Sequence, residues 1–397
     1  MRYSWPNLMR SPSQVRNLPT VYFYCRVGET HLQEDVVALA EGFRELGVPF
    51  FANGNYWRET AHGSDFLVQQ HAKITPADCD IVVVGYTWPY CPLLGSNNSF
   101  YASRHPLPPD LFAPGRRFKT VFVDNHDGWL TVSWEPEFRQ FDIILRSQLN
   151  ARAKHPDNFI PWALGLNTRV LRATSPAPPF RERQRSVLVN YGASHPYDHG
   201  ARALWRCRIE PTVARAITVD RRTDDLSVEP TDAYENLMWR QTGRRYSAAY
   251  YERLKNAQAV ACFCGELIPA LPYRAEGLTG GGRRALLRRK FYSVLSRALG
   301  KPPRSVQWDS YRFWEALAAG CVAINIDLER YGVTLPKMPT NLEHYVGIDI
   351  DRPEAALAVL EDPSRLEWIA ANGRAWALQH YSPVAQARRL LAYCGVA

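Results

Sequence analysis

Apolar residues recur along the chain at the two spacings that predict buried strands and amphipathic helices. The opening unit has an apolar run at residues 21–27, apolar positions at helical spacing over residues 35–46, and a second apolar run at residues 48–52. Gly28 interrupts the chain between the first run and the helix. A strand, a helix and a strand in this order form a βαβ unit, in which the two strands pair in parallel. The unit predicts an α/β protein with a parallel sheet.

The same alternation continues in two groups, which a change in composition separates. Further strands of the first group are predicted at residues 80–86, 120–123, 141–146 and 158–162. The second group opens with a strand and a glycine turn over residues 186–192. It then alternates strands at residues 259–265, 321–326 and 345–350 with helices at residues 250–258, 310–319, 353–360, 366–379 and 383–393. Proline, arginine, threonine and serine dominate residues 167–185 between the groups. We predict domains over residues 1–168 and 186–380, each a Rossmann-like doubly wound sheet, joined by a linker over residues 169–185.

One predicted helix carries an acidic side chain among apolar neighbours. Phe313 and Leu317 recur at helical spacing between Ser310, which can cap the helix start, and Gly320, which can supply a left-handed stop. Glu315 lies inside this helix. Its simpler interpretation is a solvated position or a satisfied salt bridge. Its functional interpretation is a carboxylate that accepts hydrogen bonds from two sugar hydroxyls.

The stretch from residue 307 to residue 327 resembles the donor-binding motif of two-domain GT-B glycosyltransferases, especially exostosin-type and related bacterial enzymes. Their pattern is approximately Ser-x-Arg/Lys-Phe-x-Glu-Ala-Leu-x-x-Gly-Cys-x-Pro-Val. The chain matches it at Ser310, Arg312, Phe313, Glu315, Ala316, Leu317, Gly320 and Cys321, with Ala323 where proline is usual. The resemblance covers most of the second domain from about residue 250 on, and the outline of the first.

The resemblance implies an α/β fold with two Rossmann-like domains that face each other across a cleft. It also implies a C-terminal helix, over residues 381–397, that packs back towards the N-terminal domain. In the donor site, Glu315 would hold hydroxyls of the ribose or the sugar. Ser310, Tyr311 and Arg312 would offer backbone N–H groups and a positive charge to a diphosphate.

The formal charge of +9 favours an anionic partner. Much of the excess lies in a basic insertion over residues 266–306, whose cluster comprises Arg283, Arg284, Arg288, Arg289 and Lys290. Lys290 is one candidate for the diphosphate. The turn from Asn190 to Gly192 after a predicted strand is another. Their simpler interpretations are a solvated helix face and an ordinary strand-to-loop turn. The charge alone also admits nucleic acid or an anionic membrane surface.

A catalytic base is expected from the first domain, at the ends of its strands. The polar residues that follow two predicted strands there are Glu29, His31, Asp124, His126 and Asp127. Asp127 is the preferred base, His126 its nearest rival, and Glu29 a further candidate. The alternative is that these residues only form turns or caps.

The motif departs from one group of the family. Retaining members often carry a second glutamate eight positions before the conserved one, where this chain has Gln307. The departure favours an inverting enzyme with direct displacement. No Asp-x-Asp motif follows a suitable strand and no cysteines or histidines have zinc spacing, so we expect no metal and no cofactor besides the nucleotide-diphosphate-sugar co-substrate.

The remaining expectations concern location, acceptor and rival functions. The sequence has no apolar run of about eighteen residues and no secretory signal, so a cytoplasmic protein is expected. The eight cysteines are interpreted as reduced and structural. The acceptor, expected at loops such as residues 87–114, could be a glycan, a natural product, a protein or modified DNA. The rivals are a non-catalytic basic protein that binds a nucleotide or nucleic acid, a DNA-modifying glycosyltransferase, and a nucleotide-sugar isomerase or hydrolase.

Overall fold

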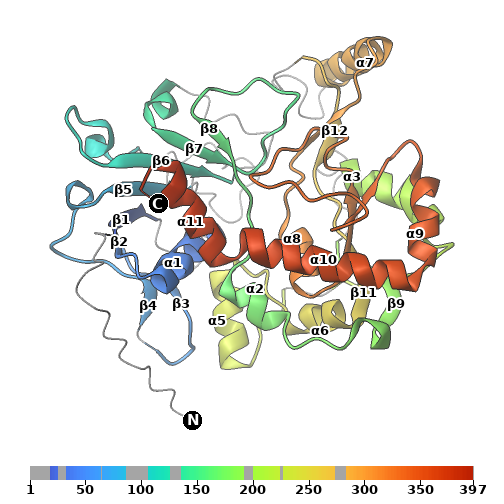
Figure 1. Ribbon diagram of the computed structural model, residues 1–397, viewed down its shortest axis with the longest axis horizontal. Coiled ribbons are helices and arrows are strands. Elements are labelled where there is room, and N and C mark those ends of the chain that lie inside the picture. The colour runs from blue at the N-terminus through green and yellow to red at the C-terminus, as the bar shows by residue number, and fades with distance from the viewer. Residues whose placement is uncertain are drawn as a thin grey trace.

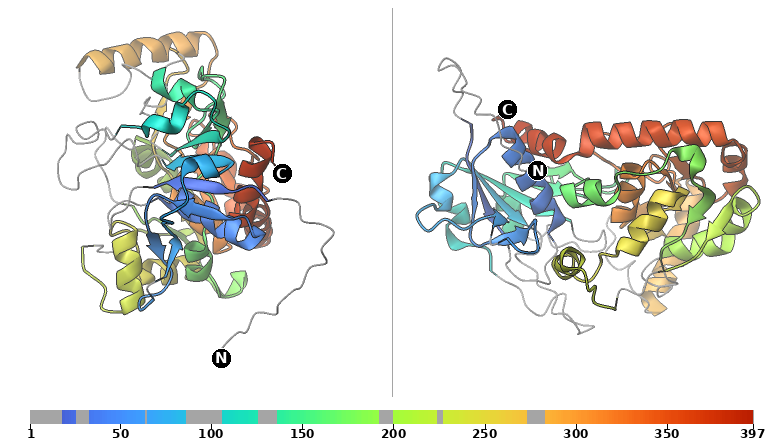
Figure 2. Two further views of the ribbon diagram at one scale, coloured as in Figure 1. Left: turned by 90° about the vertical axis from the view of Figure 1, so that its left-hand side faces the viewer. Right: turned by 90° about the horizontal axis from the view of Figure 1, so that it is seen from below.

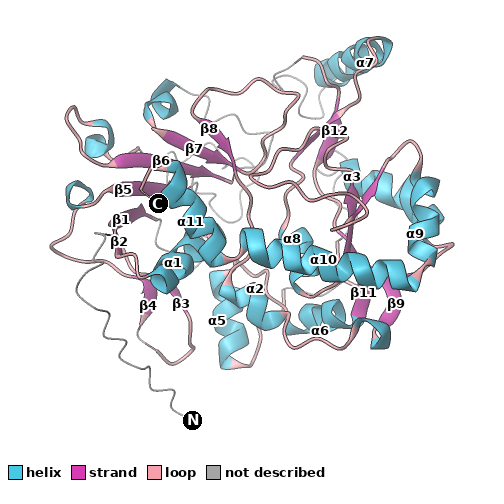
Figure 3. Ribbon diagram, viewed as in Figure 1, coloured by secondary structure: helices cyan, strands magenta, loops and turns pink. Residues whose placement is uncertain are grey.

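The computed structural model contains two parallel β-sheets with helices around them (Figure 1). It describes residues 18–25, 33–63, 65–85, 106–125, 136–191, 200–223, 227–272 and 283–396. Figure 3 shows the strands of the two sheets on opposite sides of the molecule. The α/β class predicted from the sequence is confirmed.

The first sheet has the order β2-β1-β5-β6-β7-β8 and is parallel throughout. Its strands are β1 (Val21–Tyr24), β2 (Phe50–Ala52), β5 (Ile81–Gly85), β6 (Lys119–Asp124), β7 (Ile143–Arg146) and β8 (Phe159–Pro161). The elements around it are α1 (Glu34–Leu46), the hairpin β3 (Tyr56–Arg58) and β4 (Phe66–Val68), and 3-10 turns at Pro76–Asp78, Pro109–Phe112 and Pro136–Gln140. The order reverses between β1 and β5, where loops at the carboxyl ends diverge.

The second sheet has the order β10-β9-β11-β14-β15 and is also parallel. Its strands are β9 (Gln184–Leu188), β10 (Thr218–Asp220), β11 (Ala257–Ala261), β14 (Val322–Ile326) and β15 (Val346–Ile348). Its helices are α3 (Gly200–Leu204), α4 (Glu210–Val213), α5 (Ala233–Gln241), α6 (Ala248–Asn256), α8 (Tyr311–Ala318), α9 (Leu357–Glu361) and α10 (Pro363–Tyr381), with a π-turn at Trp205–Ile209 and a 3-10 turn at Pro353–Ala356. The reversal here lies between β9 and β11.

The central strands are buried on both faces, as parallel strands between helical layers require. All five residues of β14 are buried, and the four apolar residues of β5 have no exposed surface. The sequence shows continuous apolar runs at these strands, and not an apolar–polar alternation, because both faces of each strand are buried. No helix in the described ranges combines the length and the hydrophobicity needed to cross a bilayer.

Residues 266–306 leave the second sheet between β11 and β14. They contain β12 (Glu266–Ile268), α7 (Arg283–Ala298) and β13 (Arg304–Val306), and the two strands pair only with each other, antiparallel. Gly265 adopts φ +67°, and a Cβ on it would lie 2.0 Å from the carbonyl oxygen of Val306. Only glycine permits this turn and this close approach.

The segment predicted as a linker contains the helix α2 (Thr168–Ala173) and a 3-10 turn at Phe180–Glu182. Asn167 caps α2, because its side chain accepts a hydrogen bond from the Val170 amide at 3.0 Å. Arg169 and Val170 are buried. The proline-rich composition therefore predicted the interval between the two sheets, but it did not predict that this interval contains a packed helix.

The last helix, α11 (Pro383–Tyr393), packs directly on α1 (Figures 1 and 2). A Cβ on Gly42 would lie 2.1 Å from the carbonyl oxygen of Pro383 and 2.7 Å from Cβ of Ala387. The chain thus ends against the helix that follows its first strand.

A buried carboxyl group joins α1 to α2 and makes the stability of the fold depend on pH. The Thr168 amide donates to Glu41 at 2.7 Å, and burial raises the pKa of Glu41 to about 7. In the unfolded chain this carboxyl ionises near pH 4.5. As the pH rises between these values the unfolded chain loses the proton first, so the folded state loses stability, by up to roughly 3 kcal/mol.

We therefore expect Glu41→Gln to raise the melting temperature at pH 8 and to change it little at pH 5, because glutamine keeps the bond to Thr168 and carries no charge. Melting curves across this pH range test the prediction. The exposed Glu361→Gln serves as the control. A Glu41→Gln effect that is independent of pH would show that the carboxyl does not titrate in this range.

Candidate functional site

Three segments meet at the reversal point of the second sheet. Asn190 and Tyr191 follow β9, residues 262–265 follow β11, and α8 begins beside them. The Arg312 side chain donates from Nε to the Asn190 carbonyl oxygen at 3.0 Å, and its own carbonyl accepts from Cys262 at 3.5 Å. α3 joins the same edge, where the Ala201 amide donates to the Gly265 carbonyl at 2.9 Å. Doubly wound sheets bind their ligands at this kind of point.

Two arginines share one aromatic ring at this edge. The guanidinium carbon of Arg202 lies 5.2 Å from the ring centroid of Tyr191, and that of Arg312 lies 5.5 Å from it. Burial, and after it the charge of Arg312, lowers the pKa of Arg202. The two positive charges repel each other, so an anion that binds beside both would be stabilised. Guanidinium groups bind phosphate oxygens through paired hydrogen bonds, so this pair is suited to a phosphate or diphosphate.

The start of α8 lies next to these arginines and has no side-chain cap. Ser310 occupies the N-cap position, as predicted, but its side chain makes no capping bond, so that part of the prediction is wrong. The Ser310 hydroxyl is buried and has no partner among the described residues. The first N–H groups of a helix lack intrahelical acceptors, so an anion can bind there.

Asp309, the polar residue before Ser310, does not cap the helix either. Its carboxylate accepts from Trp314 Nε1 at 2.6 Å and from the Leu164 amide at 2.8 Å. Both oxygens are therefore used to hold α8 against the segment that leaves the first sheet. Burial raises the pKa of Asp309 to about 7.

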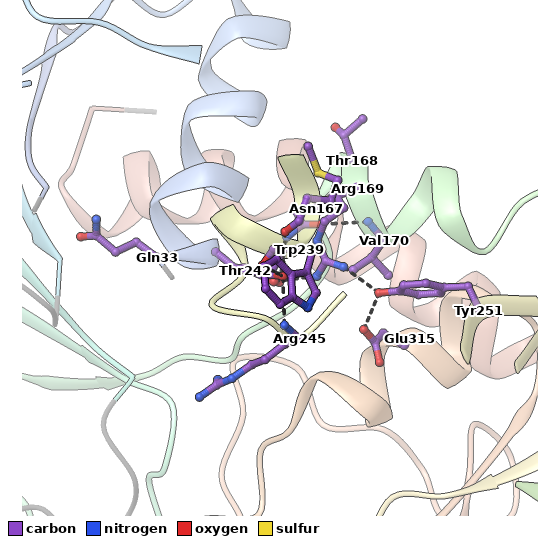
Figure 4. Close-up of polar contacts among 12 residues, drawn as sticks. Gln33, Asn167, Thr168, Arg169, Val170, Trp239, Thr242, Arg245, Tyr251 and Glu315 are labelled. Atoms are coloured by element: carbon purple, nitrogen blue, oxygen red, sulfur yellow. Dashed lines mark hydrogen bonds and ion pairs between the residues drawn. The ribbon is translucent and has the colours of Figure 1, made fainter. Parts of the chain in front are cut away.

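Glu315 faces the interior from α8 and is 7 % exposed. It accepts hydrogen bonds from the hydroxyls of Tyr250 at 2.9 Å and Tyr251 at 2.6 Å, both on α6. The Arg169 guanidinium donates to the Tyr251 hydroxyl at 2.7 Å (Figure 4). A carboxylate offers about four lone-pair positions, so two further hydroxyl donors can still be accommodated.

This network reaches the first sheet through α2. Arg169 forms an ion pair of 2.6 Å with Glu34 on α1, and the Asn167 amide donates to the same carboxylate at 2.9 Å. Burial raises the pKa of Glu34, and the nearby charge of Glu315 adds to the effect. The charge of Glu34 raises the pKa of Arg169 well above its usual value against the opposing effect of burial. The carboxylate of Glu315 is thus held by a chain of contacts across four helices.

The structure does not bring every predicted residue to this edge. Asn190 takes part through its carbonyl oxygen, and Tyr311 packs partly against the core at the start of α8. Lys290 is exposed on α7, which lies at the periphery of the molecule, away from α8 (Figure 1). Lys290 therefore receives no part in the donor site that we propose below.

Glu29, His126 and Asp127, together with Gly192, lie outside the described residues. Asp124 is described and is fully buried in an ion pair with Arg146, which is a structural role.

A different carboxyl group lies at the carboxyl edge of the first sheet. Asp35, in the first turn of α1, is 1 % exposed, and burial raises its pKa to about 7. A group with this pKa can exchange a proton near neutral pH. The sequence did not reveal it, because an acidic residue in a first helical turn is ordinary.

Sequence reasoning also missed Arg202 and the two tyrosines. Arg202 lies in a stretch with several arginines, and only its packing on Tyr191 distinguishes it. The adjacent Tyr250 and Tyr251 could have drawn attention as two hydroxyl donors at the start of a helix.

Solved structures with the same arrangement of elements include α-glucosyltransferases. An α-glucosyltransferase (AGT) in complex with UDP matches with a TM-score of 0.51 and 8 % identity, covering 95 % of this chain and 100 % of that chain. An α-glucosyltransferase in complex with UDP and a 13-mer DNA containing an HMU base matches with a TM-score of 0.50 and 9 % identity, at the same coverage of both chains. No protein-family model and no curated protein matches the sequence. The likeness shows the fold, and the predicted GT-B arrangement is confirmed.

Proposed function

We propose that the protein is a glycosyltransferase that takes its sugar from a nucleoside-diphosphate sugar. The observation that carries the proposal is the pair Arg202 and Arg312, which flank Tyr191 at the reversal point of the second sheet. A pair of cations beside an uncapped helix start has the charge and the donors that a diphosphate needs. The GT-B fold and the motif around Glu315 support the same conclusion.

The donor would be held at three places. Arg202 and Arg312 would bind the diphosphate, helped by the backbone N–H group of Tyr311 and the hydroxyl of Ser310. Glu315 would accept hydrogen bonds from ribose or sugar hydroxyls at the lone pairs that the two tyrosines leave unused. The turn from Asn190 to Gly192, predicted from the sequence, is kept as a further candidate for binding the diphosphate.

The transfer step needs a base on the acceptor side. The acceptor oxygen would attack the anomeric carbon, the bond from that carbon to the diphosphate oxygen would break, and the acceptor proton would pass to the base. We retain Asp127 as that base, with His126 and Glu29 as rivals, on the strength of their position after strands of the first sheet. The charge that develops on the diphosphate would be stabilised by the arginines.

The first test is release of a nucleoside diphosphate from a panel of UDP-, GDP-, ADP- and dTDP-sugars, with and without acceptors. UDP-sugars come first, because the similar structures hold UDP. The acceptor panel includes glycans, small natural products, peptides and DNA with hydroxymethylated bases, since one similar structure contains such DNA. We expect release with at least one donor. Nucleotide binding without any turnover would favour the non-catalytic binding protein. Release that needs no acceptor would favour a hydrolase, and conversion of the donor into another nucleotide sugar without release would favour an isomerase.

We predict inversion and no need for a divalent metal. Gln307 replaces the second carboxylate of many retaining enzymes, and two guanidinium groups can balance a diphosphate. The anomeric configuration of the product, measured by NMR coupling constants, is expected to be opposite to that of the donor. Excess EDTA is expected to leave turnover within about twofold. Retention of configuration would contradict the prediction of inversion. A loss of activity that Mg²⁺ restores would contradict the prediction that no divalent metal is needed.

A further inference from the structure

The helix α7 lies outside the proposed site and is strongly basic. It runs from Arg283 to Ala298 with the sequence RRALLRRKFYSVLSRA, which contains six basic residues and no acidic residue. Figures 1 and 2 place it at the periphery of the molecule, beyond the β12–β13 pair.

One face of α7 attaches it to that pair. Tyr292 packs against Ile268 and Val306. The Ser296 hydroxyl accepts from the Leu271 amide at 3.2 Å, and Arg289 forms an ion pair with the buried Glu266. These three positions of α7 fall on one side of the helix at a spacing of 3 or 4 residues. The orientation of α7 about its axis is thereby fixed.

The opposite face is apolar and open. Leu287, Phe291 and Val294 are 66 %, 64 % and 68 % exposed. At about 100° per residue they form one narrow stripe, which points away from the side that Ser296 and Arg289 occupy. Three large apolar side chains in line on an exposed helix are unusual for a surface that contacts only water.

Basic side chains border this stripe on both sides. Arg283, Lys290 and Arg297 recur every seven residues along one border, and Arg284 and Arg288 lie on the other, all exposed. Each lies within about a quarter turn of the stripe. The outer face therefore consists of an apolar centre with five cations around it.

We propose that α7 docks on the surface of an anionic phospholipid bilayer, with Leu287, Phe291 and Val294 inserted at the boundary of headgroups and acyl chains. The flanking cations match the negative headgroups, and the helix lies parallel to the surface. A helix of 16 residues is too short and too charged to span the bilayer. Nucleic acid fits this face less well, because phosphates would meet three apolar side chains at its centre.

The attachment of α7 connects the docked face to the proposed site. Glu266, the partner of Arg289, packs against α3, since a Cβ on Gly200 would lie 3.0 Å from its Cγ. α3 carries Arg202. An acceptor displayed on the membrane would thus approach the protein on the side where Arg202 and Arg312 lie. This consequence rests on the proposed function, whereas the docking itself does not.

Sedimentation with vesicles tests the docking. Phosphatidylcholine vesicles are compared with vesicles that contain about 30 % phosphatidylglycerol, at about 0.1 M salt. We expect the wild-type protein to sediment with the anionic vesicles only. The triple variant Leu287→Glu/Phe291→Glu/Val294→Glu is expected to lose binding at least about tenfold, and Arg284→Gln/Arg288→Gln about tenfold on the anionic vesicles. Val228→Glu, at a residue that is also 66 % exposed, is the matched control and is expected to bind like wild type.

Several results would overturn the proposal. They are failure of the wild-type protein to sediment with anionic vesicles, equal binding by the folded triple variant, and equal binding to neutral vesicles. Binding of duplex DNA that the triple variant abolishes would assign the face to nucleic acid. A dimer in sedimentation velocity that the same variant dissociates would assign it to a second copy. Nucleotide release from a soluble donor is measured in parallel, so that a failed docking and a failed enzymatic proposal remain distinguishable.

Discussion

Alanine at both Arg202 and Arg312 is expected to lower kcat/KM for the sugar donor by about a thousandfold. Hydrogen bonds to charged groups contribute about 1.5–3 kcal/mol each, and every 1.4 kcal/mol is a factor of ten. Each arginine already has contacts of its own in the protein, so we expect the loss to lie near the middle of the range for two charged hydrogen bonds, one from each arginine. Steady-state kinetics on the donor identified by the release assay give the measurement.

Binding measurements show whether the loss of kcat/KM comes from weaker binding of the diphosphate. Titration calorimetry is expected to show weakened binding of the nucleoside diphosphate and little change for the nucleoside, which has no phosphate for the arginines to bind. Arg365→Ala is the matched control, because that guanidinium also lies over an aromatic ring, 4.2 Å from the centroid of Trp368, but on α10. Unchanged diphosphate affinity in a folded Arg202→Ala/Arg312→Ala protein would remove the proposed cradle.

Glu315→Gln is expected to lower donor affinity by about ten- to a hundredfold. Glutamine keeps the size of the side chain but loses the charge and half of the accepting capacity, so Tyr250 and Tyr251 compete with the ligand for one oxygen. Binding isotherms for the nucleoside diphosphate and thermal melts of the variant are measured together.

A structural explanation for that loss is tested with Tyr250→Phe. This change removes one hydrogen bond to Glu315 and leaves the carboxylate, so it is expected to cost roughly 1–2 kcal/mol of stability and to change affinity by less than about threefold. Tyr250→Phe and Glu315→Gln with equal losses of affinity would mean that the carboxylate only organises the fold.

The elements that the sequence predicted well are those that depend on local spacing. The spacing of Phe313 and Leu317 predicted α8 in its observed place. The helix ends at Ala318 with Ala319 as its C-cap, and Gly320 follows with φ +67°, as a left-handed stop requires. The central strands followed from uninterrupted apolar runs, because burial on both faces leaves no room for polar positions.

The parts that the sequence did not predict depend on contacts between distant segments. Ser310 fails to cap α8, and Asp309 beside it is used by Trp314 and by Leu164. Arg202 acquires its role only where α3 packs beside Tyr191. No spacing rule connects such positions, since the fold decides which of them meet.

The network around Glu315 shows the same limit. Its members come from α1, α2, α6 and α8, and Arg169 lies in the interval that composition had marked as a linker.

The prediction that the cysteines are reduced and structural came from their number and spacing in the sequence alone. Each cysteine in the described ranges is free, although Cys207 is exposed and the others are buried, and Cys91 lies outside these ranges.

The central claim is that a nucleoside diphosphate binds at the edge where α3 and α8 meet β9. A crystal structure of the protein with the nucleoside diphosphate from the release assay tests it most directly. We predict phosphate oxygens within hydrogen-bond distance of both Arg202 and Arg312, and ribose hydroxyls at Glu315. A nucleotide bound elsewhere, with both guanidinium groups left as they are beside Tyr191, would contradict the account.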